Sequence, residues 1–121
     1  MNGKLLPPSA FEREPLWSNF FENKALVQFN HRIMAYITQS LSVDLLYTIL
    51  KHKMHTPSSF AGILVFTLIN YQALSGILTL LNLVPRERAN MHQMSAIVTL
   101  SSVLLMVYLA RVPIKLPPPP K

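Results

Sequence analysis

Three long apolar stretches dominate the sequence, at about residues 25–50, 60–83 and 91–110. Each is close to the roughly 20 residues that cross the hydrocarbon core of a bilayer as a helix. The second and third stretches contain no charged residue, and the first contains only Arg32 near its start and Asp44 near its end. Because a helix satisfies its own backbone hydrogen bonds inside lipid, this pattern predicts an all-α membrane protein with three transmembrane helices.

Polar, proline-containing segments separate the apolar stretches and indicate the domain organisation. We expect residues 51–57 to end the first helix and residues 84–88 to end the second. Residues 111–121 form a proline-rich tail, for which we predict an extended, polyproline-like coil. Residues 1–24 are a polar lead-in, and residues 25–110 are the transmembrane part.

The charge content supports a membrane protein and argues against nucleic acid as a partner. Only 13% of the residues are charged, about half of the roughly 25% found in soluble domains. The net charge is +6, but the Lys and Arg residues lie in short segments between apolar stretches and form no continuous basic face. The absence of cysteine excludes disulfides and thiolate metal sites. Lys and Arg residues number five on each predicted side, so charge bias alone does not orient the helices.

Two of the four histidines lie inside apolar stretches and are the main candidates for chemistry. His31 lies seven residues beyond Lys24, about 10 Å along a helix, and His92 lies four residues beyond Arg88, about 6 Å along a helix. The first and third helices run in the same direction, so both imidazoles are expected in the same outer third of the bilayer. The other two histidines, His52 and His55, lie in the basic connecting segment and are interpreted as solvated interfacial residues.

Two interpretations of His31 and His92 remain open from spacing alone. Each imidazole could simply hydrogen-bond a neighbouring helix. Alternatively, both could be axial ligands of one heme iron, since the porphyrin supplies the other four ligands. A closed zinc site is disfavoured, because it needs four protein ligands.

Other polar and small residues in the apolar stretches fit a packed helical bundle. Gln72 must find a hydrogen-bond partner inside the membrane, either on a neighbouring helix or beside a cofactor. Gly76, one turn later, allows a close helix–helix approach. Arg32 could extend to the outer surface or pair with a heme propionate. Asp44 lies about 28 Å beyond Ala25 by helical rise and is interpreted as an interfacial residue.

Several sequence segments resemble the heme A synthase family, in the same order along nearly the whole chain. They are MNGKLLPP at residues 1–8, WSNFFEN at 17–23, VQFNHR at 27–32, Gln72, GILTLL at 76–81, and His92 followed by Gln93. The resemblance implies an eight-helix protein built of two similar four-helix halves, each with two axial histidine ligands for a heme. This chain resembles the last three helices of the second half.

The family resemblance carries functional expectations. It implies that His31 and His92 bind the iron of a b-type heme, with Arg32 and Gln72 beside the cofactor. The family oxidises the C8 methyl group of heme O to a formyl group and so provides heme A for cytochrome oxidase. The first half, with the substrate site and the acidic residue usually tied to catalysis, has no counterpart in this chain, so whether the chain is itself an enzyme stays open and no catalytic residue is assigned.

We therefore expect a heme-binding C-terminal part of a heme A synthase. The alternatives are a non-catalytic membrane subunit of a respiratory complex and a small b-type cytochrome that transfers electrons. The expected partners are membrane lipid, the remaining helices of heme A synthase or a companion chain, and heme O synthase or cytochrome oxidase. The expected location is the mitochondrial inner membrane or the bacterial plasma membrane, with the lead-in outside and the tail inside.

Overall fold

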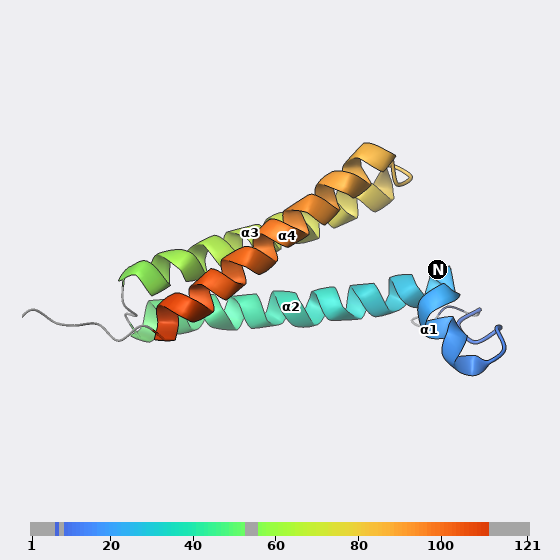
Figure 1. Cartoon of the computed structure of the whole chain (residues 1–121), viewed down its shortest axis with the longest axis horizontal. Coiled ribbons are helices and arrows are strands. Elements are labelled where there is room, and N and C mark those ends of the chain that lie inside the picture. The colour runs from blue at the N-terminus through green and yellow to red at the C-terminus, as the bar shows by residue number, and fades with distance from the viewer. Residues whose placement is uncertain (1–6, 8, 53–55, 112–121) are drawn as a thin grey trace, which may run out of the picture. The chain divides into compact units, whose positions relative to one another are not determined.

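The computed structural model describes residues 7, 9–52 and 56–111, and from Leu16 onward these are helical apart from short connections. Within them lie a 3₁₀ helix and four α-helices, which follow one another along the chain (Figure 1): η1 (Leu16–Ser18), α1 (Asn19–Glu22), α2 (Lys24–His52), α3 (Thr56–Leu81) and α4 (Arg86–Arg111). The helices α2, α3 and α4 are each long and apolar enough to cross a membrane. The prediction of an all-α membrane protein with three transmembrane helices is confirmed.

The helices α3 and α4 begin earlier than the apolar stretches suggested. Helix α3 begins at Thr56 and includes Pro57 in its first turn, where the missing N–H of proline costs little because the first N–H groups of a helix have no intrahelical acceptor. The charged residues Arg86, Glu87 and Arg88 form the first turn of α4 and are not a connecting loop. An acidic residue in a first turn, such as Glu87, is favoured by the helix dipole.

Helix α2 also ends later than predicted. His52 lies in its last turn beside Lys51, where cationic and imidazole side chains suit the negative end of the helix dipole. His52 is thus helical and exposed, and does not lie in a connecting loop. The prediction for His55 and most of the prediction for the proline-rich tail fall outside the described residues, as does the motif at residues 1–6.

The chain divides into two compact units within α2, between Ser40 and Leu41. In the first unit, the described residues before α2 fold around Asn19, whose side chain is completely buried. Its Nδ2 donates to the carbonyl oxygens of Arg13 and Leu16 at 2.8 and 3.0 Å, and its Oδ1 accepts from the backbone N–H of Arg13 at 3.0 Å and from Nδ2 of Asn23 at 3.2 Å. The side chain of Asn19 therefore satisfies three backbone groups of this short segment.

Asn23 begins α2 as its N-terminal cap. Its Oδ1 accepts hydrogen bonds from the backbone N–H groups of Ala25 and Leu26 at 3.0 and 3.3 Å. Asparagine is among the residues preferred at this position, because its side chain satisfies N–H groups that have no acceptor within the helix. The start of the first transmembrane helix is therefore specified locally.

In the second unit, α3 and α4 form an antiparallel hairpin (Figure 1). The backbone N–H of Val84 donates to the carbonyl of Thr79 at 2.9 Å, and that of Leu83 donates to the carbonyl of Leu80 at 3.2 Å. This is the Schellman arrangement that commonly ends helices. Leu83 and Val84 adopt positive φ angles of 58° and 55°, where glycine is the usual residue. Pro85 then directly precedes α4.

Small residues bring the helices together where α3 begins. Ala61 and Val65 are buried, and a Cβ added at Gly62 would overlap Cδ1 of Ile49. Ser58 donates a hydrogen bond from Oγ to the carbonyl of Leu109 in α4 at 3.2 Å. Close approach at small residues is the usual basis of helix packing in membranes, where burying apolar surface gains nothing over lipid.

Candidate functional site

The imidazole of His92 lies against the backbone of α3 at Gly76. A Cβ added at Gly76 would be 3.1 Å from Cε1 of His92, 3.5 Å from Nε2 and 3.7 Å from Nδ1. The whole edge of the ring is therefore close to a position where α3 carries no side chain. His92 itself is half-buried, with its Nδ1 atom buried.

Gln72 connects α3 to the same turn of α4 that carries His92. Its Nε2 donates to the backbone carbonyl of His92 at 3.2 Å and to Oγ of Ser95 at 2.7 Å. The hydroxyl of Ser95 also donates to the carbonyl of His92, at 3.0 Å. The polar amide of Gln72 is thereby satisfied between helices, as a polar group inside an apolar span must be.

His31 and Arg32 lie about two turns into α2 and are both exposed. They belong to the first compact unit, whereas Gln72 and His92 belong to the second. The structure thus brings Gln72 and His92 together. The prediction that His31 and His92 share one cofactor stays a prediction.

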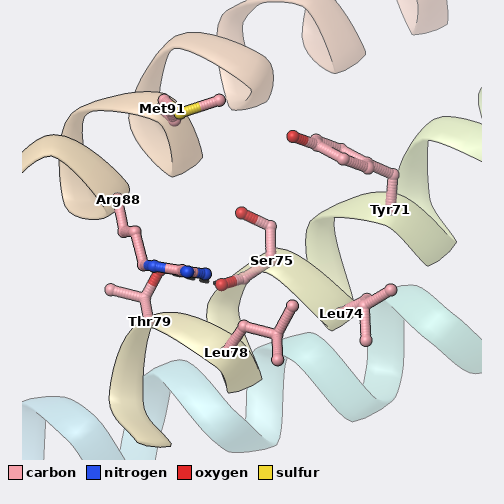
Figure 2. A pocket seen from close by; sticks show the side chains of 7 residues that line it. All are labelled: Tyr71, Leu74, Ser75, Leu78, Thr79, Arg88 and Met91. Atoms are coloured by element: carbon pink, nitrogen blue, oxygen red, sulfur yellow. Dashed lines mark hydrogen bonds between the residues drawn. The ribbon is translucent and has the colours of Figure 1, made fainter. Parts of the chain in front are cut away.

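A shallow cavity of about 120 Å³ lies between α3 and the start of α4 (Figure 2). Figure 2 shows the side chain of Arg88 extending from α4 toward Thr79 on α3, beside an apolar wall formed by Leu74 and Leu78. The hydroxyl of Thr79 donates to the carbonyl of Ser75 at 2.8 Å. The cavity is smaller than the roughly 300–1,000 Å³ of typical ligand pockets, so it does not enclose a cofactor by itself.

Sequence reasoning missed this cavity because Arg88 was assigned to a connecting segment. A signal was nevertheless present in α3, where Tyr71, Ser75 and Thr79 recur at intervals of four residues. Residues four apart share one face of a helix. The three hydroxyl groups therefore mark one stripe along an otherwise apolar span.

His31 and His92 are the described residues inside the apolar spans whose imidazoles could ligate a heme iron. No group of three or more His, Asp or Glu residues that could hold a metal ion occurs within residues 7, 9–52 and 56–111. A heme iron needs only axial ligands from the protein, and an imidazole is one of those ligands. The close contact at Gly76 holds one such imidazole beside a neighbouring helix.

These features define a helical membrane protein with histidines inside its apolar spans. Residues 1–104 match the model of a family described as cytochrome oxidase assembly protein, and the chain belongs to that family.

The chain is also similar to several bacterial heme A synthases. It is 35% identical over 114 residues to that of Ruegeria sp. strain TM1040, which covers 94% of this chain and 30% of the relative. It is 38% identical over 100 residues to the heme A synthases of Bartonella tribocorum and Chelativorans sp., which covers 83% of this chain and 28% of each relative. The chain therefore spans less than a third of the length of these relatives. No solved structure matches it.

Proposed function

We propose that this chain is the heme-binding C-terminal part of a heme A synthase, the enzyme that oxidises the C8 methyl group of heme O to a formyl group for cytochrome c oxidase assembly. The relatives of this chain are named heme A synthase, and these names support the assignment to this enzyme. In this proposal, His31 and His92 are the axial ligands of one b-type heme.

The observation that carries the proposal is the position of His92. Its imidazole lies inside an apolar span against Gly76, and an ionisable residue within a membrane is a functional candidate by default. A bis-histidine heme would supply reversible one-electron chemistry in this part of the protein.

In this proposal, His31 and His92 lie at matching depths in the membrane. His31 lies seven residues after the start of α2 at Lys24, and His92 lies six residues after the start of α4 at Arg86. These distances are about 10 and 9 Å at about 1.5 Å per residue. Because one transmembrane helix separates α2 from α4, both would cross the membrane in the same direction. Two imidazoles at one depth are what a single iron requires.

Arg32 would bind a propionate group of the same heme. It follows His31 directly, and its side chain is exposed. A guanidinium group pairs well with a carboxylate through charge-assisted hydrogen bonds. Arg32 would hold a heme propionate near the membrane surface, while His31 and His92 hold the iron.

The test is to replace each ligand in the full-length protein. We expect His31→Ala or His92→Ala to abolish the low-spin heme signal of the second half, because each change removes one axial ligand. His52→Ala is the matched control, since His52 is an exposed histidine in the last turn of α2. A normal low-spin spectrum and heme content in His31→Ala would exclude this ligand assignment.

A small b-type cytochrome that transfers electrons is a second candidate, because it would use the same pair of axial imidazoles. A heme A synthase would oxidise heme O to heme A in the presence of its remaining helices, whereas a cytochrome would only be reduced and reoxidised. Membrane lipid, the remaining synthase helices or a companion chain, and heme O synthase or cytochrome oxidase are the proposed partners. The proposed location is a bacterial plasma membrane or the mitochondrial inner membrane.

A further inference from the structure

We infer that Gln72 and Gly76 of α3 position the imidazole of His92 for axial ligation, an inference that rests on the proposed function. Gly76 sets the place of the ring, and Gln72 holds the turn of α4 that carries it. Neither residue would touch the iron. Both are positioning residues that act through His92.

A side chain at Gly76 would contact His92 more closely than ordinary packing allows. A methyl group at this position would lie 3.1 Å from Cε1 of His92, and carbon atoms normally rest about 3.5–4.0 Å apart. Adding the methyl group would therefore displace the ring by a few tenths of an ångström. The backbone of Gly76 is helical, since it lies within α3 and has no positive φ angle, so space beside His92, and not backbone conformation, accounts for glycine here.

Gln72 acts on the same turn of α4 from one helical turn away. Residues four apart lie on the same face of a helix, which places Gln72 directly next to Gly76 along α3. Its amide donates to the His92 carbonyl at 3.2 Å and to Ser95 at 2.7 Å. These bonds oppose rotation of α4 about its own axis and sliding of α4 along α3. The ring of His92 is thus fixed by a contact at its edge and by bonds at its backbone.

The other end of α3 offers matched controls. Gly62 lies fourteen residues before Gly76 in the same helix, about 21 Å away by helical rise, and a Cβ there would meet side-chain atoms of Ile49 and Met106. Ser58 donates an interhelical hydrogen bond to the carbonyl of Leu109 in α4. Substitutions at Gly62 and Ser58 change helix packing but leave Gly76 and Gln72, the residues that contact His92, in place.

The experiment compares Gly76→Ala with Gly62→Ala in the full-length, heme-loaded protein, with Gln72→Leu and Ser58→Ala as a second pair. The readouts are heme content, the electron paramagnetic resonance spectrum of the ferric low-spin heme, and its midpoint potential. We expect Gly76→Ala and Gln72→Leu to shift the spectrum and the potential. Heme affinity should fall about tenfold, the low end of the 10- to 100-fold effect of residues that orient metal ligands. Gly62→Ala and Ser58→Ala should leave the spectrum and potential unchanged.

The outcomes separate this inference from the proposed function. If His92→Ala abolishes the low-spin signal but Gly76→Ala and Gln72→Leu keep a normal spectrum and potential, the positioning role is wrong while ligation by His92 stands. Equal spectral shifts in the Gly62 and Gly76 variants would also overturn it, because they would reflect general packing. If His92→Ala itself retains the signal, the proposed function fails first. Should Gly76→Ala not accumulate in the membrane, the Gln72→Leu and Ser58→Ala pair decides, because leucine is well tolerated in an apolar helix.

Discussion

At the scale of single residues, this protein uses its few polar side chains to satisfy the backbone and one another. Asn19, Asn23 and Gln72 make hydrogen bonds to backbone atoms that are distant along the chain or at helix ends. Such bonds matter more in an apolar setting, because an unsatisfied polar group there costs several kcal/mol. The apolar residues, in contrast, are largely exposed along the membrane-spanning helices. The polar side chains therefore make the specific interactions that fix this structure.

Replacing Asn19 should destabilise the first unit. Asn19→Ala removes four hydrogen bonds, three of them to backbone atoms of Arg13 and Leu16 and one to Nδ2 of Asn23. We expect a loss of about 2 kcal/mol or more, since each hydrogen bond contributes about 0.5–1.5 kcal/mol to stability. Denaturant unfolding in detergent measures the change. The control is Asn90→Ala, at an exposed position of α4, and an equal loss in both variants would contradict this role.

At the scale of elements, the connection between α3 and α4 determines which residues of the two helices meet. The Schellman bonds at Leu83 and Val84 fix the end of α3, and Pro85 allows α4 to begin immediately afterwards. This short connection sets the register in which Gly76 faces His92 and Ser58 faces Leu109. The turn therefore contributes to the candidate site by setting this register.

Leu83→Gly should stabilise this hairpin. A left-handed conformation costs a residue with a side chain about 1–2 kcal/mol, while glycine loses about 0.5–1 kcal/mol of conformational freedom on folding. The expected net gain is up to about 1 kcal/mol by these two estimates. Leu83→Ile should instead destabilise the hairpin, because a branched Cβ is worse at a positive φ angle. Unfolding in detergent is the measurement, and a hairpin destabilised by Leu83→Gly would argue against the positive φ angle.

In the segment before α2, two asparagine side chains are buried and several aromatic side chains are exposed. Asn19 and Asn23 are buried, whereas Trp17, Phe20 and Phe21 are exposed, with Trp17 66% exposed. The segment ends where the first membrane-spanning helix begins. Aromatic side chains are enriched at the boundary between lipid and water, so this surface suits the headgroup region of the bilayer.

Trp17 is the only tryptophan in the chain and reports on this placement directly. We expect its fluorescence to be quenched by lipids brominated near the headgroup and to be less affected by lipids brominated near the chain ends. The physical reason is that an indole ring places its N–H at the polar edge of the bilayer and its apolar body just below. Efficient quenching by a water-soluble quencher, with none by either lipid, would place Trp17 in water instead.

Across the whole molecule, the sequence predicted well what depends on composition and periodicity. Three apolar stretches of membrane-spanning length predicted α2, α3 and α4, and Gln72 and Gly76 stood out as a polar and a small residue one turn apart. The sequence did not predict that both act on His92, because that depends on the register of two helices. It also misplaced the starts of α3 and α4, since charged residues and proline fit a first helical turn as well as a loop.

The 121-residue chain alone is expected to hold one heme and not a second, substrate heme. Oxidising a methyl group requires the protein to hold a substrate heme beside the oxidising chemistry. Its apolar spans contain one pair of histidines, His31 and His92, which suffices for one heme. Asp44, the acidic residue of α2, lies about 20 Å from His31 by helical rise. The apolar spans would therefore provide no second pair of histidine ligands for the substrate heme.

We accordingly expect residues 1–121 alone to produce no heme A in a strain that makes heme O but lacks heme A synthase. Membrane extracts would be analysed for heme O and heme A by chromatography, with the full-length synthase as the positive control. Co-expression with a companion polypeptide carrying the remaining synthase helices should restore heme A, and His92→Ala in this chain should reduce that restored activity if the second heme is required. Heme A formed by the chain without a companion would show that its three helices can hold both the substrate and the oxidising centre.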